Sequence, residues 1–598
     1  QDDIQGKYNG LHGNWLSGIK FIDEMHLGLN QENLPADVLS NKGRNTYYFL
    51  PFILGLIGFF FLYNRNKNLF WVMLVFFLFT GVAIKVYTNV SPFEPRERDY
   101  SVVGSFYVFA LWIGFGAYAI IETLRSKFNH NLLAPAITLI CLILVPLNII
   151  SDNWDDHDRS NRRTANAMAV KYLESCAPNA ILFTIGDNDS FPLWYAQEIE
   201  GIRKDVRVIN TSLFQTDWYI DQMKRKAYTS DPIPSKLTHN QYRAGTRDYL
   251  MVREITDDTL DIKTFMNFIS SDEKRFKLKN LLRQVGEDPS TYPNSLLNSN
   301  YLPTRNISIP VNKEMVLKNG IVADKDKNEI VDNITIKISG GALYKNRLLM
   351  LDIIANNNWE RPIYFTGGAF GDEDYIWMKD YLQLDGMCYK LTPIKTKVNK
   401  SNPFDMGRID SELMYNQIKS WNWGNSGEKI YHDPETRKNG ITYRGNIARC
   451  IEQLITEEKY QKAEELADLT LEKMPVNTFG YYTLLEPYIS AYYEIDKKEK
   501  ARNLFAETAL HYQEKLIFYS KQSIENQTKY LEEIITDIER YRSLVDVLIV
   551  YNDSIFAQQE TERFNSYLEL FRYFTGETDV TPEEDIDIEN NLRLLDSN

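Results

Sequence analysis

The chain has 598 residues, more than one hydrophobic core usually organises, so its length predicts several structural units. Its formal charge of −14 argues against a nucleic-acid partner, because phosphate binding needs a basic stripe and the arginines here are interspersed with acids. The four cysteines are widely scattered, and their spacing matches neither a zinc pattern nor a disulfide framework.

Four apolar segments without a charged residue lie within the first 150 residues. They are residues 46–63, 68–84, 102–121 and 132–150. Each is close to the ~20 residues that a helix needs to cross the hydrocarbon core of a bilayer. Soluble helices rarely lack charges on every face, so buried helices of a soluble core are the weaker interpretation. We expect residues 46–150 to form four transmembrane helices.

Basic residues in the short loops predict the orientation of these helices. Arg65 and Lys67 follow the first span, and Arg125 and Lys127 follow the third. Because cytoplasmic loops are enriched in lysine and arginine, both loops are expected to face the cytoplasm. Everything after residue 150 then lies on the opposite side of the membrane, which in a bacterium with an envelope is the periplasmic side of the inner membrane.

Residues 1–45 are expected on the same outer side, because the number of spans is even. Within this segment Trp15, Ile19 and Ile22 fall at helical spacing in a stretch too polar to cross a bilayer. This pattern is typical of a helix that lies along the membrane interface, and equally of an ordinary surface helix.

Residues 151–400 predict a soluble α/β domain. A buried strand over residues 180–185 is followed by GDNDSF, a helix over 192–200 and a second strand over 206–210. This β-loop-α-β order is the building block of a parallel sheet, and residues 362–365 read as another strand.

Residues 401–598 predict a helical domain. A helix that begins at Tyr460 contains Lys462-Ala463, and Lys500-Ala501 repeats this pair 38 positions later, with alanine and leucine on one face of each helix. The pattern resembles tetratricopeptide helix pairs, and a plain helical bundle is the alternative.

The loop SPFEPRERDY, residues 91–100, joins the second and third spans. It places Arg96 and Arg98 at the membrane surface, where a planar guanidinium can bind a lipid phosphate through two hydrogen bonds. The alternative is a solvated loop whose arginines pair with neighbouring acids.

The GDNDSF loop sits at the carboxyl end of a predicted strand, where open α/β sheets usually place ligand sites. Asp187, Asn188 and Asp189 could bind a divalent ion or hydrogen-bond sugar hydroxyls. Against this, the same residue types are common in any tight strand-to-helix turn, and Asp189 could cap the helix. We predict no metal site, and no hydrolase, nucleotide-binding or zinc-protease motif is present.

Four features together resemble the C-terminal half of a family of multi-pass bacterial membrane proteins long described only as a domain of unknown function. They are SPFEPRERDY between two spans, GDNDSFPLWY after the last span, NNNWERPIYF further on, and the tetratricopeptide-like helices. That family is similar to eukaryotic transmembrane protein O-mannosyltransferases that also end in tetratricopeptide repeats. The resemblance covers most of the chain.

The resemblance implies a GT-C type glycosyltransferase that takes a mannose-like sugar from a polyprenyl-phosphate donor and passes it to a serine or threonine of an exported protein. The catalytic carboxylate of such enzymes lies near the N-terminus of the full protein, so we expect this chain to be the C-terminal portion and assign no catalytic residue. The resemblance implies donor-phosphate contact for Arg96 and Arg98, since a leaving phosphate must be neutralised. No cofactor is identified apart from the lipid-linked sugar.

The expected partners are the bilayer, the lipid-linked sugar, and a polypeptide acceptor or envelope protein that binds the helical repeats. The alternative function is a non-enzymatic, membrane-anchored periplasmic scaffold. Transport is the weaker interpretation, because the four spans contain almost no ionisable residue and no internal repeat.

Overall fold

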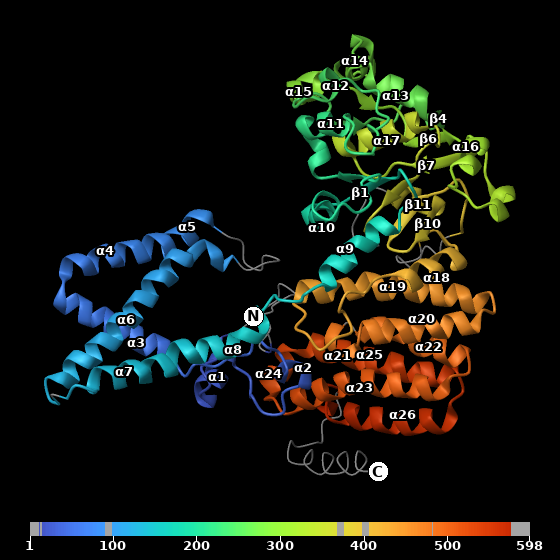
Figure 1. The fold of residues 1–598 in the computed structure, drawn as a ribbon. Helices are drawn as coiled ribbons and strands as arrows, with labels where there is room; N and C mark the ends of the chain where they lie inside the picture. The colour runs from blue at the N-terminus through green and yellow to red at the C-terminus, as the bar shows by residue number, and fades with distance from the viewer. Residues whose placement is uncertain are drawn as a thin grey trace. The chain divides into compact units, whose positions relative to one another are not determined.

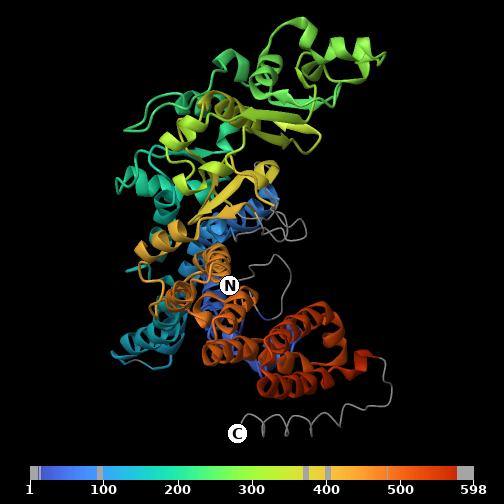
Figure 2. The ribbon, with the colours of Figure 1, turned by 90° about the vertical axis from the view of Figure 1, so that its right-hand side faces the viewer.

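The chain forms two compact units, which are shown as ribbons in Figures 1 and 2. The computed structural model describes residues 11, 15–89, 98–128, 130–367, 376–397, 406–480 and 482–575. The first unit combines residues 1–161, 429–437 and 476–598, and the second combines 162–428 and 438–475. The domain boundaries expected from the sequence stay predictions.

The N-terminal apolar region is helical, as expected. Its helices are α3 (Leu50–Arg65), α4 (Lys67–Leu78) continued through a π-helical turn by α5 (Ile84–Thr88), α6 (Val103–Arg125), and α7 (Leu133–Leu142) continued through a second π-helical turn by α8 (Asn148–His157). Within the described residues, three continuous helices are long and apolar enough to cross a membrane, namely Lys67–Thr88, Asp99–Arg125 and Leu133–His157.

The first apolar helix, α3, is shorter than the sequence predicts. It has 16 residues, about 24 Å at 1.5 Å per residue, against a hydrocarbon core of about 30 Å. The helix does not extend back to Thr46 because Tyr48 and Phe49 adopt positive φ angles of 49° and 55°. Thr46 instead forms a bridge with Leu16. The count of four spans therefore stays a prediction.

Glycines bring α3 and α6 into close contact. A Cβ atom added to Gly58 would lie 1.8 Å from the carbonyl oxygen of Trp112, and one added to Gly116 would lie 2.0 Å from that of Leu54. Close approach through small residues is the usual way in which membrane helices pack, since apolar side chains gain little by leaving lipid. The buried side chains around Trp112 include Phe70.

Two contacts place the start of α3 beside the end of α8. The Lys42 ammonium lies 2.8 Å from the Asp155 carboxylate, and the Asn45 amide donates to the carbonyl of Asp152 at 3.0 Å. The chain therefore enters and leaves this helical bundle at the same end.

The segment before α3 also contacts the C-terminal helices of its own unit. It contains α1 (Lys20–Leu27) and α2 (Ala36–Leu39). The backbone N–H of Asn30 donates to the Gln522 side chain at 2.8 Å, and that of Ala36 donates to the Glu514 carboxylate at 2.8 Å. The interfacial position expected for this segment stays a prediction.

The second unit has a six-stranded sheet in the order β12-β10-β11-β9-β1-β2. The strands are β1 (Ile181–Thr184), β2 (Arg207–Asn210), β9 (Ile363–Phe365), β10 (Leu382–Asp385), β11 (Cys388–Leu391) and β12 (Arg408–Ile409). β1 pairs in parallel with β2 and with β9, so the expected β-α-β unit is confirmed. Helices α9 (Thr164–Glu174) and α10 (Asp187–Glu198) lie next to β1 in Figure 1. Leu173 of α9, Leu182 of β1 and Leu193 of α10 share one core.

The middle of the second unit contains two small sheets, β5-β3-β8 and β4-β6-β7. Their strands are β3 (Tyr249–Val252), β4 (Leu260–Asp261), β5 (Tyr301–Leu302), β6 (Asn306–Pro310), β7 (Asn333–Lys337) and β8 (Ala342–Tyr344). The helices are α11 (Asp217–Met223), α12 (His239–Tyr242), α13 (Ile262–Ser270), α14 (Leu278–Gln284), α15 (Asn294–Leu297), α16 (Lys313–Lys318) and α17 (Lys345–Asn357).

The C-terminal region is helical, as expected. Its helices are α18 (Ser411–Ser420), α19 (Pro434–Thr456), α20 (Tyr460–Lys473), α21 (Val476–Phe479), α22 (Glu486–Glu494), α23 (Lys498–Ser520), α24 (Ile524–Lys529), α25 (Leu531–Val550) and α26 (Ser554–Glu569). The starts of α20 and α23 lie 38 positions apart, but the two helices have 14 and 23 residues. The tetratricopeptide assignment stays a prediction.

Candidate functional site

The first candidate site lies at the end of the bundle where the chain enters and leaves it. Arg96 lies outside the described residues. Arg98 directly precedes a short 3-10 turn, Asp99–Val102, that leads into α6. The carbonyl of Arg98 accepts from the hydroxyl of Ser101 at 2.7 Å and from the Lys85 ammonium at 3.5 Å. The structure thus adds Lys85, at the end of the preceding apolar helix, to the cations expected here.

The second candidate site lies where β1, β2 and β9 end. Asp187 Oδ1 is 3.5 Å from the amide nitrogen of Asn210, which ends β2. Asp189 Oδ2 is 3.5 Å from the hydroxyl of Thr366, which follows β9. Asn188 is exposed between them. Burial raises the pKa of the Asp189 carboxyl. The sequence did not pair these residues, although parallel strands place their carboxyl ends at one edge of a sheet.

The residues expected as a loop form the first turn of α10. The helix begins at Asp187 rather than at residue 192. Acidic side chains stabilise the positive end of a helix dipole, and the Ser190 hydroxyl donates to the Gly186 carbonyl at 2.7 Å. Gly186 is the N-cap residue and no side chain caps the helix, so the cap considered for Asp189 is not formed. The exposed oxygens of Asp187 and Asn188 can still accept hydrogen bonds from a ligand hydroxyl.

The part of the chain that the structure describes holds no group of three or more histidine, cysteine or acidic side chains close enough to bind a metal ion. The acidic residues at the strand ends pair with amide and hydroxyl groups instead.

A groove of about 630 Å³ adjoins the strand ends and was not anticipated from the sequence. It is lined by α10, by β2, by α11 and by residues 225–230. Four of its side chains are aromatic, namely Trp194, Trp218, Tyr219 and Tyr228. Trp218 and Tyr228 are each 55% exposed. The only sequence signal was the presence of large aromatics in otherwise polar segments after predicted strands.

Two buried arginines hydrogen-bond the segment of residues 225–232, which forms the outer wall of the groove. One Nη of Arg207, on β2, donates to the carbonyls of Arg225 and Ser230 at 2.9 and 3.0 Å. Arg361, two residues before β9, is 7% exposed. The five acceptors of its guanidinium are the carbonyls of Asn179, Ala180, Asp231 and Pro232 and the hydroxyl of Ser230. Burial lowers the pKa of Arg361 to about 10, so it stays charged at neutral pH.

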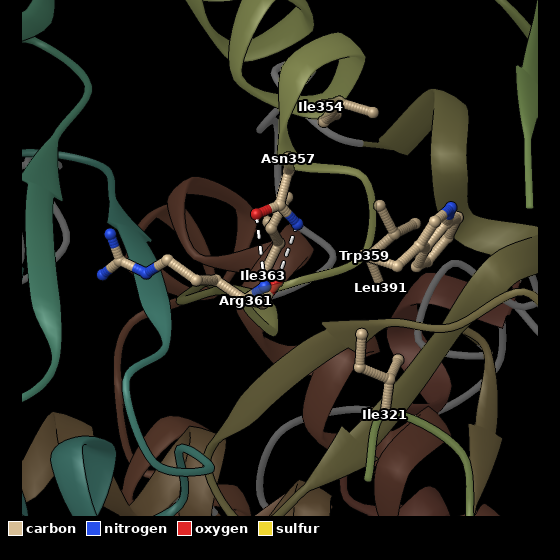
Figure 3. A pocket seen from close by; sticks show the side chains of 7 residues that line it. All are labelled: Ile321, Ile354, Asn357, Trp359, Arg361, Ile363 and Leu391. Atoms are coloured by element: carbon tan, nitrogen blue, oxygen red, sulfur yellow. Dashed lines mark hydrogen bonds between the residues drawn. The ribbon is translucent and has the colours of Figure 1, made fainter. Parts of the chain in front are cut away.

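Figure 3 shows Arg361 beside a small cavity at the start of β9. The Asn357 side chain accepts from the backbone N–H of Arg361 at 3.2 Å and donates to its carbonyl at 2.7 Å. The cavity measures about 10 Å³, about the space of one water molecule. The RPIYF segment therefore has a structural role, in which Arg361 ties β9 to β1 and to the groove wall.

Comparison with known proteins identifies one part of the chain. No solved structure matches the chain. The matched segment, residues 165–413, begins in α9, contains the six-stranded sheet and ends in α18. Over these residues the chain matches the protein family described as TMEM260-associated domain 2.

Proposed function

We propose that the chain is part of a membrane glycosyltransferase that passes a mannose-like sugar from a polyprenyl-phosphate donor to serine or threonine of an exported protein. One observation carries the proposal: a domain associated with TMEM260, a protein O-mannosyltransferase-like family, follows a set of apolar membrane helices in one chain. We further propose that the membrane is the bacterial inner membrane and that the soluble regions lie in the periplasm.

The contacts at the ends of the helical bundle support this arrangement. Because the start of α3 lies beside the end of α8, the chain crosses the bilayer an even number of times between them. Three helices are long enough to cross, so a fourth crossing by α3 satisfies this condition. The basic loops after α3 and α6 then face the cytoplasm. Arg98 and Lys85 lie at the opposite, outer end.

We propose that the outer-end cations bind the phosphate of the lipid-linked donor. Lys85 and Arg98 lie next to each other where an apolar helix ends and another begins, which is the level of lipid headgroups. A guanidinium presents two parallel donors to a phosphate, and neutralising the leaving phosphate favours sugar transfer. Arg96, two residues away in the sequence, adds a second guanidinium.

The test is a double substitution in the full-length protein, Arg96→Ala with Arg98→Ala, followed by mass spectrometry of sugars on exported proteins. A charge-assisted hydrogen bond is worth roughly 1.5–3 kcal/mol, so we expect transfer to fall by about 10- to 100-fold. The matched control, Lys274→Ala with Arg275→Ala, removes two exposed adjacent cations of the second unit and should leave transfer unchanged. Equal glycosylation in a folded double variant and its parent would refute the phosphate role and favour the scaffold function.

A further inference from the structure

The groove runs along the outer edge of a sheet. β2 is the last strand of the six-stranded order, so among the residues that the structure describes one of its edges has no neighbouring strand. Three consecutive residues, Val206, Arg207 and Val208, line the groove. Because successive side chains of a strand point to opposite faces, three residues in a row can line one groove only through the backbone edge.

The hydrogen bonds of β2 show which backbone groups face the groove. The N–H groups of Arg207 and Thr211 donate to carbonyls on the β1 side, so alternate residues point outward. Of these, the Val206 carbonyl accepts from Gln197, and the Asn210 N–H donates to Tyr219. Among the described residues, no hydrogen bond reaches the outward N–H and C=O of Val208.

Among the described residues, the outward N–H and C=O of Val208 are therefore unpaired backbone groups in the middle of the strand edge. The exposed fraction of Val208 is 4%, and buried backbone groups in native proteins are nearly always paired. An extended peptide that lies along a strand edge supplies one donor and one acceptor to every second residue. Such a peptide would pair with Val208, and at about 3.3 Å per residue roughly four of its residues would follow the length of β2.

The side chains of the groove favour an acidic peptide. Lys204, Arg225 and Lys226 line it against a single acid, Glu198. That acid accepts a hydrogen bond from the Tyr228 hydroxyl, and the Lys204 ammonium lies 4.6 Å from the centre of the Tyr228 ring. The groove is therefore basic in a chain whose formal charge is −14. Exposed tryptophan and tyrosine side chains are the residues that contribute most to peptide binding.

We infer that this groove binds an extended, acidic segment of a polypeptide as an added strand on β2. The inference rests on the proposed function only in identifying that polypeptide with the acceptor of the sugar. The groove reaches the strand ends, since the N–H of Leu213, which lines the groove, donates to the Asn210 side chain at 3.0 Å. A peptide on β2 would thus pass close to Asp187.

The test measures peptide binding by the full chain in detergent, without any sugar donor. Fluorescence anisotropy is recorded with a labelled nine-residue peptide of alternating threonine and glutamate. Two comparison peptides are measured in the same way. One carries lysine in place of glutamate, and the other carries N-methyl groups at every internal amide. We expect the acidic peptide to bind at least tenfold more tightly than the lysine peptide, and N-methylation to weaken binding at least fivefold, since it removes the backbone donors.

Charge reversal on the protein gives a second readout. Arg225→Glu with Lys226→Glu should weaken the acidic peptide at least tenfold. The matched control, Lys274→Glu with Arg275→Glu, reverses two exposed adjacent cations outside the groove and should leave Kd unchanged. Trp218→Ala should also weaken binding.

Three results would overturn the inference: no binding of any peptide, equal binding of the acidic and lysine peptides, or displacement of the peptide by a neutral mannose oligosaccharide. The last would mark the groove as a sugar site. Because no donor is present, loss of sugar transfer in the Arg96 and Arg98 double variant does not affect this measurement. Intact transfer with no peptide binding would refute the inference alone.

Discussion

Removing the guanidinium of Arg361 should loosen the outer wall of the groove. We consider Arg361→Met, which has a long apolar side chain and keeps most of the buried volume. The substitution removes five hydrogen bonds, although the carbonyls of Ala180 and Asp231 keep a second donor in Arg207. Each hydrogen bond is worth about 1 kcal/mol net, and relief from burying a charge offsets part of the loss. The expected cost is about 3–5 kcal/mol.

Hydrogen exchange followed by mass spectrometry measures this cost locally. The amides of Ala227 and Ser230 are protected in the parent, because each donates to the other residue's carbonyl, at 3.1 and 2.9 Å. Since every 1.4 kcal/mol is a factor of ten, exchange over residues 225–232 should become about 100- to 3,000-fold faster. The matched control is Arg283→Met, at an exposed arginine of α14. Unchanged exchange over residues 225–232 in the Arg361 variant would refute the role assigned to it.

Two further predictions concern the helical bundle and the pH dependence of stability. In Gly116→Leu the new Cβ meets the Leu54 carbonyl at 2.0 Å, against 3.4 Å for ordinary contact. We therefore expect α3 and α6 to separate and the melting temperature in detergent to fall, with a loss of about 1–3 kcal/mol; Gly114→Leu, where nothing lies within 4 Å, should melt like the parent. Burial lowers the pKa of Lys171 from 10.5 to about 8. Between these two pH values the amine is protonated in the unfolded chain and neutral in the folded chain, so the free energy of unfolding of the parent rises with pH. Relative to Lys171→Met, the free energy of unfolding should increase by about 2 kcal/mol from pH 7 to pH 10; a difference independent of pH would contradict the buried charge.

The sequence predicted the elements whose burial is uniform. β1 and β2 are buried at every residue. β1 reads as a short apolar run, whereas β2, which starts at Arg207 and ends at Asn210, was recognised by its place after a strand and a helix. The helices of the N-terminal region were predicted for another reason, since long apolar segments without charges are typical of membrane-spanning helices. The predicted start of the first span was wrong, because hydropathy does not report backbone angles such as the positive φ of Tyr48 and Phe49.

The candidate site could be predicted only in part. The position of Asp187 at the end of a parallel strand followed from the β-α-β pattern. Its neighbour Asn210 is 23 residues away, and Thr366 is 177 residues from Asp189, so neither pairing follows from local spacing. The groove combines α10, α11 and the edge of β2. The strand order that leaves β2 at the edge depends on β9, which lies far along the chain.

Labelling of introduced cysteines in intact cells tests the membrane arrangement most directly. Asn267→Cys places a thiol on an exposed position of the second unit, and Ser126→Cys places one after α6. The three native cysteines outside the apolar helices are buried, so the introduced thiols should dominate the reaction. Once the outer membrane is permeabilised, a maleimide that does not cross the inner membrane should label the thiol at position 267 and leave the one at 126 unlabelled. Labelling at position 126 alone would place the second unit in the cytoplasm and contradict sugar transfer to exported proteins.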